Sequence, residues 1–432
     1  MSTRASELSL REQVGVVRTG AVPAEDLATQ VRRAIELHEP ELDAWVCLSS
    51  TIAAEARAVD RDPGSAPLAG VSVGVKDLID VAGMPTRAGS AVTSPDAVGT
   101  DAACVTRLRS LGAIVQGKTV TTEFGYFTPG PTRNPHALDH TPGGSSSGSA
   151  AAVAAGTVPL ALGTQTAGSL TRPASYCGAA GMVLAHGTTD MSGITGLSES
   201  LDSLGLLTRS VADLRFVHNA FTGRERSDAR APEPVARGLV WNAGALHPLE
   251  PPMAALLEHV PALLEEIGVK AEPLDWDDHV QTLAEDHITV MSYEAARARA
   301  HEFDEHAQAL SAPIRDLLEN GRRTPGAEYS AALTRRDRSR ELLDEILDSA
   351  PIIVGPAALG PAPLGLSATG SPILSRPWQL LGLPVVVVPG ARIPAGLPLG
   401  LQIVGLPGHE DRLLDVGEKL EALLRELPVI AV

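Results

Sequence analysis

The sequence predicts an α/β protein whose strands are covered by helices on both faces. Short apolar runs bounded by glycine, proline or polar residues recur along the chain, which is typical of strands buried on both sides. Stretches with helix-start and helix-stop signals separate these runs. The 432 residues would fill two or three domains by length alone. Large α/β enzymes of this size often keep one sheet, however, and we expect a single domain over 1–432.

The N-terminal segment predicts two helices. Ser9-Leu-Arg-Glu12 is a capping box, in which each side chain satisfies a free backbone N–H, and the helix that it opens is expected to end near Gly20. Pro23 suits the first turn of a second helix that ends near His38. We expect both helices to pack outside the core.

Buried strands are predicted toward both ends of the chain. Three early apolar runs fit the pattern, at residues 71–75, 113–115 and 158–162. Three later runs fit it as well, at residues 351–354, 385–388 and 399–404. The region between, about 223–348, is expected to be mainly helical from 250 onward. It begins with a segment rich in Arg, Glu, Ala and Pro, 223–237, which favours a mobile surface connection. Residues 351–432 would then add the last strands to the same sheet.

The net charge of −17 and the three cysteines exclude several classes of protein. Nucleic acids and anionic membranes demand basic patches, so we expect neither as a partner. Cys47, Cys104 and Cys177 are too few and too scattered for a disulfide framework or a metal site. The N-terminus lacks a basic-then-apolar signal pattern, and no apolar run approaches the roughly 20 residues of a membrane span. We therefore expect a cytoplasmic protein.

Lys76 is the first candidate for a catalytic residue. It is one of only four lysines in a chain with 31 arginines, and it ends the nearly uncharged, strand-like run 67–75. Arginine keeps its proton in proteins, whereas a lysine buried among apolar groups can lose it. The position therefore indicates a site that needs a neutral amine.

Two segments rich in glycine and hydroxyl side chains lie at 141–150 and 163–169. The first runs into an alanine-rich helix that can pack close to a sheet. The second follows a predicted strand, so its backbone N–H groups can converge on an anion, as an oxyanion hole requires. The donors would be the N–H groups of Thr166, Ala167, Gly168 and Ser169. Either segment alone would be a solvated turn or linker, but their combination with Lys76 indicates a catalytic site.

These blocks occur in a recognisable order: Pro-Leu-Ala-Gly-Val-Ser-Val-Gly-Val-Lys-Asp at 67–77, then 141–156, then 163–178. Shorter segments accompany them: the Gly-Lys-Thr turn at 117–119, then 130–135, 200–205 and 382–401. In these motifs the chain resembles the amidase signature family of serine hydrolases over almost its whole length. The resemblance implies a Ser-Ser-Lys triad inside 67–205, with Ser169 as nucleophile, Ser145 as bridging serine and Lys76 as base.

The resemblance also carries expectations about fold, chemistry and partners. It implies a single α/β/α domain around a large mixed sheet, and a non-proline cis peptide beside the bridging serine. Neutral Lys76 would take a proton from Ser145, which would take one from Ser169 as that serine attacks the amide carbon. The relay needs no metal and no organic cofactor. The expected partner is a small-molecule amide. The sequence is also compatible with a homodimer.

The nucleophile block departs from the commoner family pattern. Gln165 replaces an Asp, Ala167 a Gly and Thr171 an Arg, with Arg172 one place later. If the family's Asp and Arg form an ion pair, exchanging both for neutral polar groups leaves no buried orphan charge. We interpret the exchange as a subgroup trait that keeps activity. Residues 182–185 also lack the Lys-Pro-Thr usual after this block, which is a second departure from the family pattern.

Three other motifs compete with this interpretation. Residues 112–119 satisfy the P-loop expression, but Ala-Ile-Val-Gln within it is strand-like, so Lys118 is expected to be solvated or structurally paired. The nucleophile-elbow motif around Ser146 lacks a strand before it. His301 and His306 have the wrong spacing for a zinc helix and are expected on a solvated face.

Aromatic side chains are candidates for the acyl pocket. Four of them stand out in a chain with 3% aromatic residues: Tyr126, Phe127, Tyr176 and Trp378. Each one taken singly also suits core packing or loop anchoring.

The sequence thus predicts an amidase that hydrolyses a small carboxamide through an acyl-Ser169 intermediate. One alternative is an amidotransferase subunit of the same family, which passes the acyl group or the ammonia to another acceptor. The other is a catalytically silent scaffold homologue, motivated by the altered segments 165–172 and 182–185. Arg172 and Arg376 could bind a carboxylate, but arginine is so frequent here that its presence discriminates little.

Overall fold

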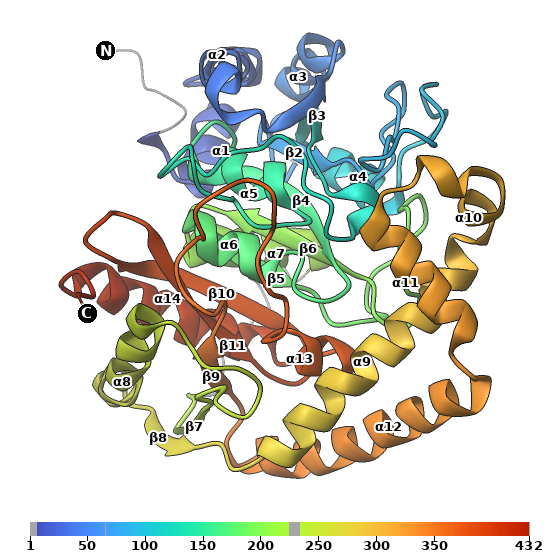
Figure 1. The fold of residues 1–432 in the computed structure, drawn as a ribbon. Helices are drawn as coiled ribbons and strands as arrows, with labels where there is room; N and C mark the ends of the chain where they lie inside the picture. Colours follow the sequence, from blue (N-terminus) through green and yellow to red (C-terminus); the bar gives the residue numbers. More distant parts are fainter. Residues whose placement is uncertain (1–6, 65, 224–233, 432) are drawn as a thin grey trace.

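A large mixed sheet forms the centre of the molecule. The computed structural model describes residues 7–64, 66–223 and 234–431, and in these residues one 11-stranded sheet has the order β1-β3-β2-β4-β6-β5-β10-β11-β9-β7-β8 (Figure 1). The strands are β1 (Trp45–Leu48), β2 (Ser72–Lys76), β3 (Ile114–Thr119), β4 (Leu160–Gln165), β5 (Ala180–Val183), β6 (Ser203–Thr208), β7 (Arg237–Val240), β8 (Lys270–Pro273), β9 (Ile353–Pro356), β10 (Val385–Arg392) and β11 (Pro398–Val404). β2 pairs in parallel with β3 and β4. Neighbouring strands in the part of the sheet with the order β4-β6-β5-β10-β11-β9 pair antiparallel.

Helices cover both faces of this sheet (Figure 1), as the resemblance implied. The α-helices are α1 (Leu10–Arg18), α2 (Ala24–Leu42), α3 (Ile52–Arg61), α4 (Ala103–Ser110), α5 (Ser147–Ala154), α6 (Thr171–Cys177), α7 (Val211–Thr222), α8 (Pro251–Glu266), α9 (Asp277–Ala298), α10 (Ala300–His306), α11 (Ala312–Arg323), α12 (Gly326–Ser349), α13 (Arg376–Leu380) and α14 (Glu410–Glu426). Alternate residues of β4 belong to different cores: Leu160 and Leu162 join one buried cluster and Ala161 the other. Strands covered on both sides therefore read as continuous apolar runs.

All six predicted strands are present, and the strands from the two ends of the chain share one sheet. Residues 117–119, expected as a turn, are instead the last residues of β3. Five strands were not predicted: β1, β5, β6, β7 and β8. In β6, Gly205 interrupts the apolar run, and a Cβ there would overlap the side chain of Leu170. The packing that fixes this glycine is not visible in the sequence.

The two N-terminal helices follow the sequence signals at their starts. The capping box of Ser9 and Glu12 is formed in full. The second helix runs past the expected end at His38, through Pro40, and stops where Asp43 adopts a left-handed conformation. The expectation that both helices pack outside the core was wrong, because their apolar faces belong to the same buried cluster as β2.

The helix of small side chains, α5, packs against the sheet and the adjoining backbone. A Cβ at Gly148 would clash with the Ala44 carbonyl and lie 2.5 Å from the Val120 nitrogen. Glycine is required there because the helix start touches other backbone directly. This contact holds the start of α5 close to the backbone of Ala44 and Val120.

The region between the two sets of strands is mainly helical, as predicted, but β8 interrupts it. The 22-residue helix α9 packs against α11, α12 and α13 (Figure 1). Most of the segment 223–237, predicted as a mobile connection, lies outside the described residues. No helix among the described residues is both long and apolar enough to cross a membrane.

Candidate active site

The end of β2 places the Lys76 amine inside the protein among hydroxyl groups. Lys76 is fully buried. Its Nζ lies 2.7 Å from Ser145 Oγ, 3.0 Å from Ser146 Oγ and 2.8 Å from Thr164 Oγ1. The carbonyl oxygen of Thr164 is at 3.3 Å. All four partners are neutral oxygens, and hydroxyls can donate as well as accept.

Burial lowers the pKa of Lys76 well below its ordinary value, since the charged amine loses its hydration. The negative charge of Asp202 works in the opposite direction. Asp202 accepts a 2.5 Å hydrogen bond from Thr166 Oγ1 and further bonds from the N–H groups of Leu197 and Ser198. A neutral amine can donate to the Thr164 oxygens and accept a proton from Ser145, so the environment suits a base.

Ser145 lies in the glycine-rich segment before α5. The Gly144–Ser145 peptide is cis, as the resemblance implied. The Gly144 carbonyl accepts a 2.6 Å hydrogen bond from Arg172 Nη2, which ties this segment to α6. Ser146 is the N-cap residue of the helix α5 and is fully buried.

Ser169 lies in the loop that connects β4 to α6. Its carbonyl accepts a 2.9 Å hydrogen bond from the Ser146 N–H, so the two hydroxyl-rich segments are joined directly. The N–H groups of residues 166–169 donate to no acceptor among the described residues. Free N–H groups in consecutive residues are what an oxyanion site needs.

His287 of α9 holds this loop from the other side. Its Nε2 lies 2.8 Å from the Thr166 carbonyl oxygen, 121 residues away in the sequence. A carbonyl only accepts, so Nε2 carries the proton. Burial lowers the pKa of His287 to about 3, and the imidazole is neutral at pH 7. No motif in the sequence pointed to this residue.

A narrow pocket joins the two serines. Ser145, Ser169, Thr166 and Ala167 all line it. The volume that the centre of a water molecule can occupy in this pocket is about 20 Å³. The site therefore suits a small group. No hydrogen bond joins the Ser145 and Ser169 hydroxyls among the described residues, although both face the same pocket.

The four aromatic candidates separate into two pairs. Tyr126 and Phe127 line the pocket, with their rings 4.7 Å apart in an edge-to-face contact. Tyr176 and Trp378 do not line it and are almost completely buried. Trp378 packs edge-on against Trp241, with ring centroids 5.1 Å apart. For Tyr176 and Trp378, which were candidates for the pocket or for packing, the structure therefore favours packing.

The exchanged pair in the nucleophile block is in direct contact. Gln165 Oε1 accepts hydrogen bonds from the Thr171 hydroxyl at 3.0 Å and from the N–H groups of Leu170 and Thr171. Gln165 Nε2 donates to Gln379 Oε1 at 3.0 Å. Neutral hydrogen bonds thus satisfy both positions without a buried charge. The other departure, 182–185, overlaps β5, which pairs with β6 and β10 and does not line the pocket.

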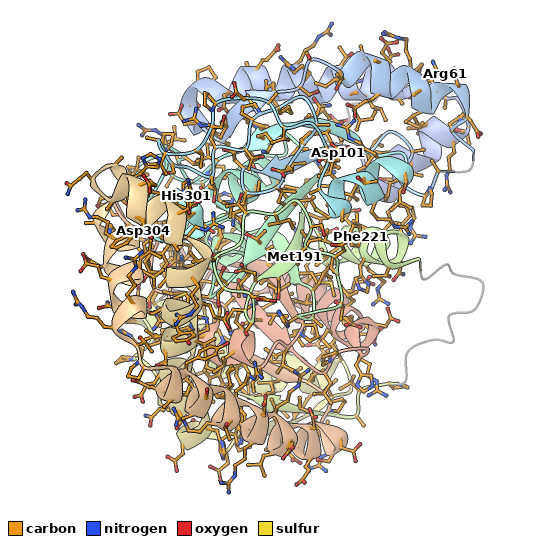
Figure 2. All side chains as sticks on the ribbon, turned by 90° about the vertical axis from the view of Figure 1, so that its right-hand side faces the viewer. Arg61, Asp101, Met191, Phe221, His301 and Asp304 are labelled. Atoms are coloured by element: carbon orange, nitrogen blue, oxygen red, sulfur yellow. The ribbon has the colours of Figure 1, made fainter. Side chains whose placement is uncertain are left out.

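The competing motifs have structural explanations. Lys118 is buried in β3 and forms a 2.9 Å ion pair with Asp77, so residues 112–119 make no phosphate loop. Ser146 follows no strand, which argues against an elbow nucleophile. His301 lies with Asp304 at the periphery of the molecule on α10 (Figure 2). Among the described residues no group of three or more His, Cys, Asp or Glu side chains could hold a metal.

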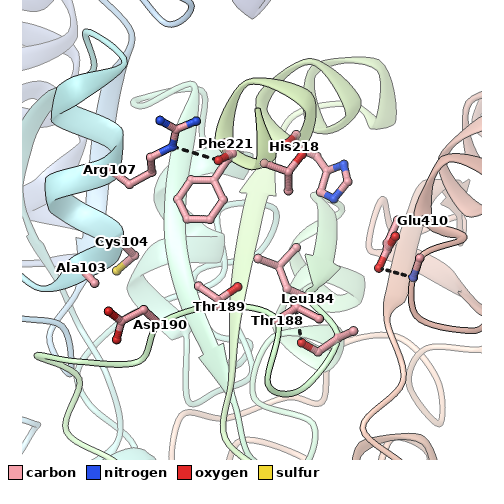
Figure 3. A pocket seen from close by; sticks show the side chains of 13 residues that line it. Ala103, Cys104, Arg107, Leu184, Thr188, Thr189, Asp190, His218, Phe221 and Glu410 are labelled. Carbon is pink, nitrogen blue, oxygen red and sulfur yellow. Dashed lines mark hydrogen bonds between the residues drawn. The ribbon is translucent and has the colours of Figure 1, made fainter. Parts of the chain in front are cut away.

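A larger cavity lies away from Lys76, Ser145 and Ser169. It has about 520 Å³ open to the centre of a water molecule and is lined from α4, α7, the loop after β5 and the start of α14 (Figure 3). Arg107 borders it and donates to the Phe221 carbonyl at 3.0 Å. It contains no hydroxyl bonded to a lysine, so its size does not make it the better candidate for the chemistry.

Comparisons with known proteins identify the family of the chain. The family described as Amidase matches residues 26–414. A protein of Mycobacterium tuberculosis named as an amidase, AmiA2, is 32% identical over 94% of this chain and 91% of its own length. A protein of Thermus thermophilus named as one of the subunits of glutamyl-tRNA(Gln) amidotransferase is 30% identical, covering 92% of this chain and 93% of its own.

Solved structures show the same fold. A crystal structure of an amidase superposes with a TM-score of 0.85 at 29% identity, covering 96% of this chain and 100% of that one. The native peptide amidase from Stenotrophomonas maltophilia gives 0.80 at 26% identity, covering 98% of each chain.

The fold and these relatives define an enzyme that hydrolyses amides. The chain belongs to the amidase signature family.

Proposed function

We propose that this chain hydrolyses the C–N bond of a small carboxamide through an acyl-Ser169 intermediate. The observation that carries the proposal is the fully buried Lys76 amine, 2.7 Å from the Ser145 hydroxyl, in one pocket with Ser169. Burial without a carboxylate partner disfavours the charged form of a lysine, so such an amine can act as a base. Such a base is what two serines need in order to act as a nucleophile and a proton carrier.

Lys76, Ser145 and Ser169 have distinct roles in the proposed reaction. Neutral Lys76 takes the Ser145 proton, and Ser145 takes the Ser169 proton as the Ser169 oxygen attacks the carbonyl carbon. The resulting oxyanion is held by the free N–H groups of residues 166–169. Ser145 then protonates the departing nitrogen, and ammonia or an amine leaves. Water repeats the relay, which frees the carboxylate and Ser169.

The alternative within the family is an amidotransferase subunit that delivers ammonia to a second protein. Relatives named as subunits of glutamyl-tRNA(Gln) amidotransferase, at 30 and 31% identity, motivate it. The altered segments 165–172 and 182–185 motivate a silent scaffold homologue. Because Gln165 and Thr171 are hydrogen-bonded to each other and 182–185 lies outside the pocket, we favour the active enzyme.

The test is ammonia release from a panel of small primary amides by the purified chain alone. We expect ammonia and carboxylate in equal amounts, with no added partner. Ammonia that appears only when a second protein and its acceptor are present would favour the amidotransferase. A folded protein that hydrolyses no amide and takes no covalent serine label would favour the scaffold.

A further inference from the structure

Two arginines face the proposed reaction centre. Arg172 lies three residues after Ser169 in α6, and Arg376 is the first residue of α13. Both line the pocket that contains Ser145 and Ser169. They come from distant parts of the sequence, so the fold itself brings the two positive charges together.

The hydrogen-bonding capacity of these arginines is only partly used. Arg172 is 4% exposed, and its Nη2 donates to the Gly144 carbonyl and to Thr369 Oγ1, at 2.6 and 3.2 Å. Its Nε and Nη1 are buried without a partner among the described residues, and so is the Nε of Arg376. Neither arginine pairs with a carboxylate of the described residues.

Both side chains keep their charge. Burial lowers the pKa of Arg172 to about 10, which leaves the guanidinium protonated at pH 7. The charge of Arg376 lowers the pKa of Arg172 further, so the two groups repel each other. Buried cations without a counter-ion are unfavourable, and an anion between them would relieve both the repulsion and the unmet N–H groups.

We infer that Arg172 and Arg376 form a carboxylate subsite, and that the substrate is a small carboxamide carrying a carboxylate on its acyl part. This inference rests on the proposed function. A carboxylate matches the planar fork of a guanidinium and can accept from both arginines at once. The narrow pocket places such a group within the length of a small molecule from Ser169. The product would then be a dicarboxylic acid.

The test compares two amides of nearly equal shape: succinamate, which carries a carboxylate, and 4-oxopentanamide, in which a methyl ketone replaces it. We expect kcat/KM to favour succinamate by about 10- to 100-fold, as charge-assisted hydrogen bonds imply. Arg376→Met should remove most of this preference. Arg340→Met, on the exposed side of α12, is the matched control and should leave the ratio unchanged. Malonamate and glutaramate then define the distance between the subsite and Ser169.

Arg172 also holds the Gly144 carbonyl, so its substitution can disturb Ser145 and is not the primary test. Calorimetric binding of succinate gives a readout that does not need turnover: the wild type should bind it, and Arg376→Met should bind it at least about tenfold more weakly. Hydrolysis of both amides at equal kcat/KM would overturn the carboxylate subsite and leave the amidase intact. Arginine-dependent succinate binding by a protein without amidase activity would support the subsite and overturn the proposed reaction.

Discussion

The amine of Lys76 lies 2.7 Å from the hydroxyl of Ser145, and the lysine side chain is fully buried. The two residues are 69 positions apart in the sequence. Lys76 Nζ contacts oxygens of Ser145, Ser146 and Thr164, and it contacts no carboxylate of the described residues. Because the amine is also buried, its pKa is lowered and it binds its proton weakly. This relationship determines how the site should respond to mutation and to pH.

Replacement of Lys76 should remove turnover and leave the fold intact. Lys76→Ala takes away the proton acceptor, and we expect kcat/KM to fall by about 10³-fold, within the range of general-base effects. Amide hydrolysis and the circular-dichroism melting curve would be measured together. Lys419→Ala is the matched control, because Lys419 is exposed on α14 and pairs with Asp415, far from the pocket residues. A Lys76→Ala enzyme with near-normal turnover would exclude the role of base.

Activity should rise with pH as Lys76 loses its proton. Burial lowers the pKa of Lys76 in the folded protein, so the base is active above that lowered pKa and inactive below it. The rise in kcat/KM should end well before pH 10.5, the ordinary value for lysine. Stability should change in the same direction, because the unfolded chain binds one more proton between the two pKa values. A profile of kcat/KM that keeps rising up to pH 10.5 would contradict this.

The Gln165 and Thr171 exchange should behave as a coupled pair. Gln165→Asp buries a negative charge and loses the bond to Gln379, and Thr171→Arg buries a positive charge. We expect each single variant to lose about 2 kcal/mol of unfolding free energy, and the double variant to regain part of it. Urea unfolding of the four proteins in this cycle measures the coupling. Additive losses would show that the two positions are independent.

His287 should act by positioning the loop of residues 166–169. His287→Phe removes the donor to the Thr166 carbonyl, so kcat should fall by about tenfold or more while KM changes little, because oxyanion stabilisation acts in the transition state. His287→Gln keeps an N–H donor and should recover part of kcat. If both variants lose stability and activity equally, His287 is only a packing residue.

The sequence was sufficient for the fold class and for naming Lys76, Ser145 and Ser169 as candidates. Glycine and hydroxyl clusters next to buried strands carry a local signal, which is why Lys76, Ser145 and Ser169 could be named before the geometry was known. The roles of Asp202 and His287 could not be assigned from the sequence, since they depend on contacts between distant elements. Aromatic residues are ambiguous for the same reason. Phe127 faces the pocket and Trp378 the core, and only packing distinguishes them.

The central claim is that Ser169, and no other serine, becomes acylated. Intact-mass measurement after treatment with a fluorophosphonate tests it on three proteins: wild type, Ser169→Ala and Ser146→Ala. We predict one adduct on the wild type and on Ser146→Ala, and none on Ser169→Ala. An adduct that persists on Ser169→Ala and disappears on Ser146→Ala would move the nucleophile to Ser146 and contradict the proposed triad.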